Sequence, residues 1–113
     1  MHELAITEGI MDAALPEAEK AGAKRIIEIR LKIGELSGVM PECIKYYFDI
    51  VSRGTIAEGA TISTEKIPVG IECRSCGFKG DIDRKKIICP SCGKADFTIF
   101  KGREYYVDSL EVE

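Results

Sequence analysis

The stretch that decides the fold reads CRSCG at residues 73–77 and CPSCG at residues 89–93, with twelve residues between the two cysteine pairs. Two residues between cysteines let both thiolates reach one ion from a single tight turn. The glycine that follows lets the backbone double back, so that amide N–H groups point at sulfur and offset its negative charge. Two such turns make a tetrahedral cage of four sulfurs. This cage predicts a closed, structural zinc site with the ligands Cys73, Cys76, Cys89 and Cys92.

Other uses of paired cysteines fit this sequence less well. Disulfides need an oxidising compartment, and the first fifteen residues carry Glu3, Glu8 and Asp12, which no secretory hydrophobic segment tolerates. No apolar run reaches the roughly 20 residues of a membrane span, so we expect a cytoplasmic protein with reduced thiols. A redox CxxC normally opens a helix in a βαβ unit, a context that neither pair has. A four-sulfur cage also suits iron, which is the alternative metal. The fifth cysteine, Cys43, is interpreted as a small buried hydrophobe.

Residues 69–101, which contain the four cysteines, cannot assemble a large core, because glycines and Pro90 separate their short apolar runs. Zinc binding supplies on the order of 10 kcal/mol of folding energy, so we expect the metal to order this lobe. Strand-like residues resume after Gly102. The zinc lobe is therefore predicted to be an insertion, with residues 1–68 and 102–113 forming the other lobe.

Hydrophobic periodicity predicts an α/β lobe around this insertion. The first expected element is a helix over residues 3–22, which Pro16 kinks or divides and Gly22 stops. A strand over residues 25–33 follows and ends at Gly34, and a second helix runs from Pro41 to Gly54 with an apolar stripe of Ile44, Tyr47, Phe48 and Val51. The last two elements are a strand over Thr61–Ile67 and a strand over Tyr105–Val112, the latter with Tyr106, Leu110 and Val112 on one face.

The charge is distributed unevenly along the chain, and this bears on nucleic-acid binding. Residues 1–68 carry eight Lys or Arg against eleven Asp or Glu, whereas residues 69–101 carry seven against four. Four thiolates on one Zn²⁺ lower the charge of the second segment to about +1. A nucleic-acid-binding zinc ribbon needs a basic, aromatic face. The three basic residues at 84–86 are a modest cluster on a lobe of low net charge, so nucleic-acid binding is kept only as an alternative function. No HExxH motif or second histidine is present, so we expect no enzyme.

The N-terminus holds a second candidate metal site. His2 is the only histidine, and we expect Met1 to be retained before so bulky a residue. The α-amine, the backbone nitrogen of His2 and a ring nitrogen of His2 can chelate one ion in fused rings, with Glu3 as a candidate oxygen ligand. Nitrogen donors in a plane suit Ni(II) or Cu(II). A Met-His start without any role is the alternative, and from these residues alone it is the more frequent case.

The whole chain resembles the HypA family of [NiFe]-hydrogenase maturation factors, which are nickel metallochaperones. The residues that carry the resemblance are the opening Met1-His2-Glu3, the segment LKIGELS at residues 31–37, the following helix with Phe48, the four cysteines, and the acidic final strand ending LEV at residues 110–112. In some members an acidic side chain in the loop before the second helix is a nickel ligand. Here that loop reads Gly38-Val39-Met40, and Glu42 is the nearest acid.

The resemblance implies a nickel-binding lobe with a small mixed sheet and two helices, joined to the four-cysteine zinc-ribbon-like lobe. It implies that Met1, His2 and Glu3 bind Ni²⁺ as transient cargo, beside a structural Zn²⁺. It also implies partnership with the nickel-handling GTPase HypB and delivery to the hydrogenase large subunit, with urease maturation proteins as further partners in some members. No nucleic acid and no membrane are expected as partners. A zinc-stapled adaptor, in which His2 has no role, is the alternative function.

Overall fold

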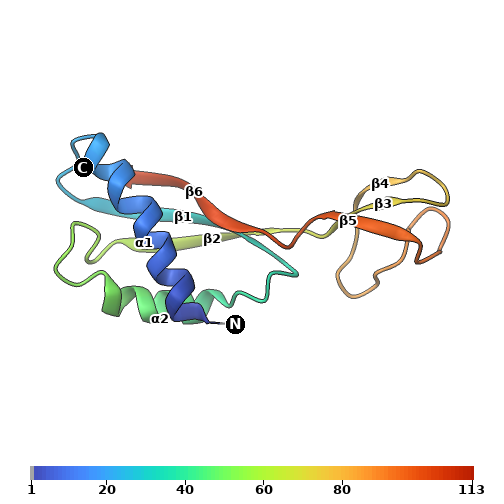
Figure 1. The fold of residues 1–113 in the computed structure, drawn as a ribbon, viewed down its shortest axis with the longest axis horizontal. Coiled ribbons are helices and arrows are strands. Elements are labelled where there is room, and N and C mark those ends of the chain that lie inside the picture. Colours follow the sequence, from blue (N-terminus) through green and yellow to red (C-terminus); the bar gives the residue numbers. More distant parts are fainter. Residues whose placement is uncertain (1) are drawn as a thin grey trace. The chain divides into compact units, whose positions relative to one another are not determined.

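The structure, a computed structural model, describes residues 2–113. Its elements, in chain order, are α1 (Glu3–Lys20), β1 (Ile26–Gly34), α2 (Pro41–Val51), β2 (Thr61–Ile67), β3 (Gly70–Cys73), β4 (Lys79–Asp81), β5 (Phe97–Lys101) and β6 (Tyr105–Val112) (Figure 1). The strands form two three-stranded sheets, in the orders β2-β1-β6 and β4-β3-β5. The class expected from the sequence, α/β with a four-cysteine lobe, is confirmed.

The chain divides into two compact units. Unit 1 comprises the residues up to Lys32, Val39–Glu65 and Tyr106–Glu113, and unit 2 comprises Ile33–Gly38 and Lys66–Tyr105. Unit 2 therefore combines the cysteine-bearing segment with a short piece of chain from well before it. The lobe boundaries expected from the sequence, at residues 68 and 101, stay a prediction.

Helix α1 runs without interruption through Pro16, so the expected alternative of two separate helices is wrong. Proline removes only one hydrogen bond, and the surrounding turns keep the helix in register. The helix ends as predicted at Gly22, which has a φ of 68°. The Gly22 N–H donates to the carbonyl of Glu19 at 3.0 Å, and the Ala23 N–H donates to that of Ala18 at 3.0 Å. These two hydrogen bonds are the Schellman arrangement, which favours glycine at this position.

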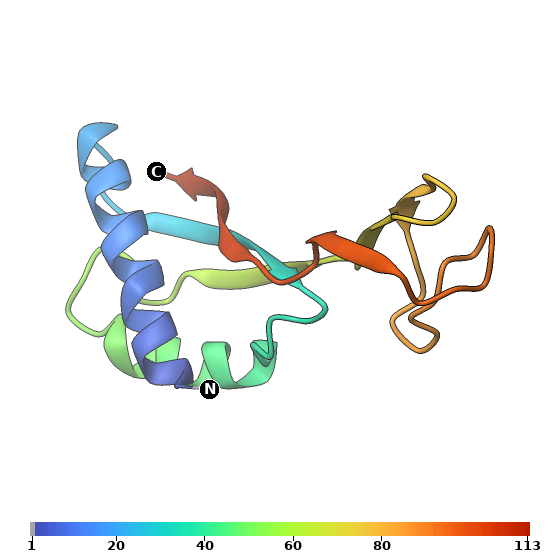
Figure 2. The ribbon, with the colours of Figure 1, turned by 45° about the vertical axis from the view of Figure 1, so that its right-hand side comes forward.

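The core of unit 1 lies between the helices and β1. Residues Ile29 and Leu31 of β1 are buried, and the buried helical side chains are Ile6, Thr7, Ile10, Met11, Ala14 and Ala18 of α1 with Ile44 and Phe48 of α2. Helix α2 starts at Pro41 as predicted, although it ends at Val51, before Gly54. The N-terminal end of α1 lies beside α2 in both ribbon views (Figure 1 and Figure 2).

Strand β1 is the central strand of its sheet, and its side chains alternate from Ile29 to Ile33 because only one of its faces is buried. In Figure 1, β1 and β2 run in the same direction and β6 runs in the opposite direction, so the sheet is mixed as expected. The polar face of β1 carries ion pairs, between Arg30 and Glu28 at 2.8 Å and between Lys32 and Glu65 at 2.9 Å. Pairs this exposed contribute little stability, and their main effect is to keep this face in water.

Strand β6 has the bounds that the sequence predicted, but the predicted face is right only for Leu110, which is partly buried. Tyr106 is 48% exposed and Val112 is 36% exposed, whereas Val107 and Ser109 are partly buried. The physical reason is that β6 lies at the edge of its sheet, beside β1 alone. An edge strand is covered on fewer sides, so apolar side chains along it are not evidence of a buried face.

Unit 2 contains three short strands, β3, β4 and β5, that periodicity did not reveal. Both β4 and β5 pair antiparallel with β3, with Ile71 opposite Gly80 on one side and Ile99 on the other. The buried core of this unit is small: Val69, Ile71, Cys73, Ile82 and Cys89, against which Leu36, Phe78, Phe97 and Ile99 pack. Two of the five buried core residues are cysteines, so the predicted lack of a large core is confirmed.

Residues 33–38 are tied to unit 2 by backbone hydrogen bonds. The Glu35 N–H donates to the Ile67 carbonyl at 3.0 Å, and the Leu36 N–H donates to the Gly102 carbonyl at 2.7 Å. This pairing brings Gly34 against the backbone of Gly102, which has a φ of 112°. A Cβ atom on Gly34 would lie 2.8 Å from the Glu104 carbonyl oxygen and closer still to that of Gly102.

No helix within the described residues 2–113 has the length and apolar character needed to cross a membrane.

The contact between Gly34 and Gly102 predicts a position-specific effect of alanine. Gly34→Ala should destabilise the protein by about 2–3 kcal/mol, because backbone rather than a movable side chain surrounds the new methyl group. Gly9→Ala is the matched control. A Cβ at Gly9 has open space, and alanine in a helix interior is favoured by about 1 kcal/mol. Urea unfolding should show a lower midpoint for Gly34→Ala and an equal or higher one for Gly9→Ala. Equal midpoints for both variants would contradict the packing described.

Candidate metal centre

Two turns of identical backbone geometry carry the four cysteines. In the first, the Cys73 N–H donates to the Phe78 carbonyl at 2.7 Å, and the Gly77 N–H donates to the Cys73 carbonyl at 3.0 Å. In the second, the Cys89 N–H donates to the Lys94 carbonyl at 2.9 Å, and the Gly93 N–H donates to the Cys89 carbonyl at 2.8 Å. The two glycines have φ values of 80° and 75°, a conformation that glycine adopts without strain.

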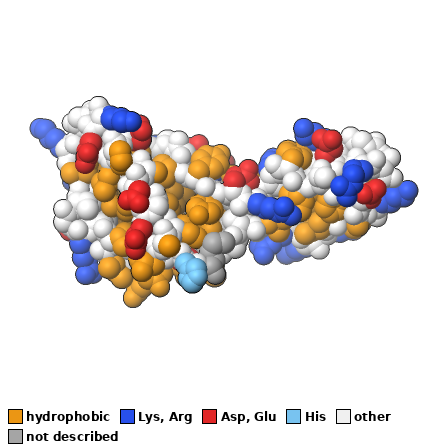
Figure 3. Space-filling model, viewed as in Figure 1, with side chains coloured by type: hydrophobic (Ala, Val, Ile, Leu, Met, Phe, Trp, Pro, Cys, Tyr) orange, Lys and Arg blue, Asp and Glu red, His pale blue; other side chains and the backbone are white. Residues whose placement is uncertain are grey.

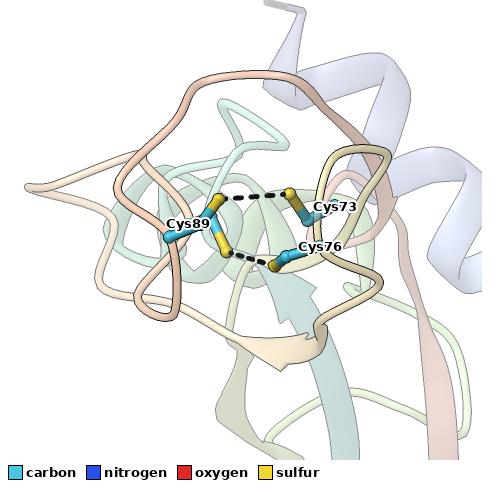
Figure 4. A group of neighbouring side chains, drawn as sticks. Cys73, Cys76 and Cys89 are labelled. Carbon is cyan, nitrogen blue, oxygen red and sulfur yellow. Dashed lines mark hydrogen bonds between the residues drawn. The ribbon is translucent and has the colours of Figure 1, made fainter.

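The two turns bring all four sulfur atoms together, within 4.8 Å of one another. The Cys73 and Cys92 sulfurs are 3.7 Å apart, and the Cys76 and Cys89 sulfurs are 3.5 Å apart. Figure 4 shows the side chains of Cys73, Cys76 and Cys89 pointing toward one another from two loops. A tetrahedral ion with metal–sulfur bonds of about 2.3 Å sets its ligand sulfurs about 3.8 Å apart. The four thiols therefore fit one tetrahedral zinc ion.

These sulfur distances exclude disulfides in the structure, since a disulfide bond is only about 2.05 Å long. All five cysteines are free thiols. Cys73 and Cys89 are buried in the core of unit 2, whereas Cys76 and Cys92 are exposed. The site is thus half inside the lobe and half at its surface, and the first cysteine of each pair is also part of the hydrophobic core.

The backbone favours the thiolate form at the first cysteine of each pair. The pKa of Cys73 is lowered, chiefly by the Cys76 N–H that points at its sulfur, against the opposing effect of burial. Burial is the largest influence on Cys89 and raises its pKa, but hydrogen bonds from the N–H groups of Cys92 and Ser91 lower it to about 7. The amide-to-sulfur contacts expected from the sequence pattern are therefore present in both turns.

The thiol of Cys92 is harder to deprotonate than an ordinary cysteine thiol, because its pKa is raised. The Lys94 N–H lowers the pKa of Cys92, but burial and the neighbouring sulfurs, that of Cys73 first among them, together raise it to about 11. Sulfurs this close to one another cannot all carry negative charge unless a cation lies between them. A coordinating divalent ion supplies that charge and deprotonates its ligands outright. The geometry of the cluster suits one cation, and four sulfur ligands would leave no open coordination position.

Polar contacts link the two turns at the surface. Arg74 forms an ion pair with Asp96 at 2.8 Å, and the Lys94 ammonium donates to the Ser75 hydroxyl at 3.3 Å. Sequence analysis did not single out these residues, nor Phe78 and Lys94, whose carbonyls close the turns. The available signal was the repeat itself: Phe78 and Lys94 occupy the same place after their glycines. Cys43 lies apart in α2 and is partly exposed, so its interpretation as a small buried hydrophobe is only partly right.

The candidate nickel residues lie at the start of α1, in unit 1. Met1 is outside the described residues. His2 precedes the first residue of the helix, and its side chain is exposed (Figure 3). Its carbonyl accepts the Ile6 N–H at 3.1 Å, and the buried Thr7 hydroxyl donates to the Glu3 carbonyl at 2.6 Å. The first helical turn is therefore held firmly behind His2 and Glu3, whereas the imidazole faces solvent.

The three residues directly before α2, Gly38-Val39-Met40, carry no acidic side chain. Val39 is buried, and Met40, which precedes the helix, is 55% exposed. Glu42 is in the first turn of α2 and is exposed. Residues 38–40 therefore supply no acidic ligand of the kind that the resemblance implies.

Comparison with known proteins gives a match over residues 1–112 to the family described as "Hydrogenase/urease nickel incorporation, metallochaperone, hypA". A relative named hydrogenase maturation factor HypA, from Caldanaerobacter subterraneus, is 39% identical, with both chains covered in full. One of the same name from Methanothermobacter thermautotrophicus is 37% identical, over all of this chain and 98% of its own.

Solved structures support the same fold. The solution structure of the Ni metallochaperone HypA from Helicobacter pylori matches 99% of this chain and 97% of its own, with a TM-score of 0.71 at 21% identity. A second structure, titled "Solution structure of HypA protein", matches all of this chain and 97% of its own, with a TM-score of 0.74 at 22% identity. The full-length family match and the sequence identities settle the relationship: this chain belongs to the HypA family of nickel-incorporating metallochaperones that act in hydrogenase maturation.

Proposed function

We propose that this protein binds Ni²⁺ through Met1, His2 and Glu3 and delivers it to the large subunit of a [NiFe]-hydrogenase. The observation that carries the proposal is the position of its only histidine, exposed and immediately before the first helical residue. A cargo site must be specific and yet release its ion. A chelate at the surface meets both needs better than a buried cage.

The helix start supports this chelate in a second way. The first N–H groups of any helix have no carbonyl partner within the helix. The backbone nitrogen of His2 therefore takes no part in the hydrogen bonds of α1, and its use as a metal ligand breaks none of them. The N-terminal end of a helix also favours negative charge, which suits the Glu3 carboxylate in the first turn. Protons compete with Ni²⁺ for these nitrogens, which gives one route to release.

We propose that a HypB-type GTPase exchanges nickel with this protein, as the family resemblance implies. The family description also includes urease, so urease maturation proteins are a second candidate destination. The four thiols need a reducing compartment, and the cytoplasm is the compartment that we propose. Each partner handles or receives nickel, and none requires catalysis by this chain.

A prediction follows for nickel binding by the untagged protein. His2→Ala should weaken Ni²⁺ binding at least tenfold, because it removes the imidazole ligand. Glu8→Ala, which removes an exposed carboxylate farther along α1, should bind Ni²⁺ as the native protein does. Isothermal titration with Ni²⁺ measures both.

A second variant tests the α-amine without any substitution. A short extension before Met1 should abolish high-affinity binding while leaving the circular dichroism spectrum unchanged. Native affinity in the extended protein and in His2→Ala would reject the N-terminal site and leave the zinc-stapled adaptor.

We also propose that Cys73, Cys76, Cys89 and Cys92 hold one structural Zn²⁺. The support is the fit of four sulfurs to one tetrahedral ion and the N–H groups that point at them. When bound, zinc supplies positive charge and no reaction. The residues of unit 2 then keep the two turns closed around it.

Zinc analysis tests this proposal with a matched pair of cysteine variants. Cys89→Ser should lose the one zinc per chain, because it removes a ligand that is also buried in the core. Cys43→Ser should keep it, since Cys43 lies outside the cluster. Limited proteolysis should then cut Cys89→Ser within residues 66–105 and spare the control. Full zinc content in Cys89→Ser would contradict the assignment.

A further inference from the structure

One surface of unit 2 carries positive charge that zinc binding does not explain. Unit 2 carries nine Lys or Arg against six Asp or Glu, whereas unit 1 carries seven against thirteen. Three of the acids of unit 2 are used in ion pairs: Arg74 with Asp96, Lys79 with Glu72, and Lys101 with Asp81. Among residues 2–113, no ion pair involves Arg84, Lys85 or Lys86, which follow one another on the surface.

A defined turn presents these three cations, which we call the basic turn (residues 84–86). The Asp83 carboxylate accepts the Lys85 N–H at 2.8 Å, and the Asp83 carbonyl accepts the Lys86 N–H at 3.0 Å. A short polar side chain that caps its own turn in this way fixes the backbone. Asp83 is thereby engaged with the backbone, and the side chains of the basic turn point into solvent.

A groove of about 520 Å³ adjoins the basic turn. Lys86 is at its rim, and its apolar lining comes from Ile82, Ile88 and Pro90. The two carboxylates at the groove are already occupied, that of Asp81 by Lys101 at 2.6 Å and that of Asp83 by the turn itself. Asp83 keeps its negative charge and offsets one of the three cations of the basic turn. The aliphatic lining of the groove therefore lies beside a net excess of two positive charges.

We propose that this groove and the basic turn bind an acidic peptide segment of a partner protein, with one apolar side chain in the groove and carboxylates against residues 84–86. Hydrophobic and basic side chains adjoin each other on the face of unit 2 seen in Figure 3. The proposal goes beyond nickel binding and does not depend on it.

A peptide suits this surface better than nucleic acid does. Single-stranded nucleic acid is bound by aromatic side chains on which bases stack. No aromatic side chain from the described part of the chain lines the groove. The charge of the basic turn is also local, since the protein as a whole has a formal net charge of −3. Carboxylates at short range match that distribution, whereas a long polyanion would meet the acidic residues elsewhere.

The groove also touches the candidate zinc centre, since Cys89 and Gly93 of the second cysteine turn are among its lining residues. A peptide seated there contacts the backbone that holds one pair of sulfurs. The proposed peptide site and the second cysteine turn are thus next to each other within unit 2.

Fluorescence anisotropy with the zinc-loaded full chain tests the proposal. The probe is a short fluorescein-labelled peptide of glutamates with one central leucine. The triple reversal Arg84→Glu, Lys85→Glu, Lys86→Glu should weaken binding at least about tenfold, because three attractive contacts become repulsive. The matched control, Lys24→Glu, Lys45→Glu, Arg53→Glu, makes the same charge change in unit 1 and should bind as the native protein does. Zinc content is measured for every variant.

A second peptide keeps the test independent of any variant's folding. Serine in place of the central leucine should weaken binding severalfold, since the groove then receives no apolar side chain. Equal affinity for the two peptides, or equal losses in both triple variants, would overturn the proposal. So would tighter binding of a single-stranded oligonucleotide than of the leucine peptide. The proposal would also be overturned if the protein did not bind the peptide but formed a dimer that only the charge reversal at residues 84–86 dissociates. The surface would then be assigned to a second copy of the chain.

Discussion

Four sulfur atoms that two matching turns hold within 4.8 Å of one another are the constraint on which unit 2 depends. Its buried core is small, and Cys73 and Cys89 supply part of it, so two of the four clustered thiols also fill the interior. The two turns repeat the same hydrogen bonds, and their N–H groups lower the pKa of the first cysteine in each. The neighbouring sulfurs raise the pKa of Cys92, and a bound cation would offset that repulsion.

Unit 1 contains the residues proposed to bind nickel, a cargo ion that has to be released again. Its own stability comes from apolar packing of α1 and α2 with β1, and no cysteine of the four belongs to it. His2 and Glu3 stand at the first turn of α1, which hydrogen bonds from Ile6 and Thr7 hold in place. The proposal assigns the two metals accordingly, a structural ion to the four thiols of unit 2 and the cargo ion to the exposed ligands at the start of α1.

Much of this could be predicted from the sequence, because the strongest signals are local. The repeated CxxCG spacing gave the cluster, and the alternation in β1 gave a strand with one buried face. Gly22 and Pro41 marked the end of one helix and the start of another. Neighbouring residues suffice for each of these inferences. Family resemblance, in turn, directed attention to His2, which the residues alone left undecided.

What the sequence could not supply depends on contacts between distant segments. Leu36 packs in the core of unit 2, and its N–H bonds to Gly102, a pairing that no local pattern reveals. The three short strands of unit 2 contain too few residues for a clear period. The exposure of Tyr106 follows from the position of β6 at a sheet edge, which is a property of topology and not of the strand.

X-ray absorption at the nickel edge, on native protein loaded with one Ni²⁺ per chain and with its zinc in place, tests the central claim most directly. A site built from the α-amine, His2 and Glu3 predicts nitrogen and oxygen neighbours only, with the outer-shell scattering of one imidazole. Sulfur atoms in the first shell of nickel would mean that the cargo occupies the four-cysteine cluster, and the assignment of separate sites for the two metals would be contradicted.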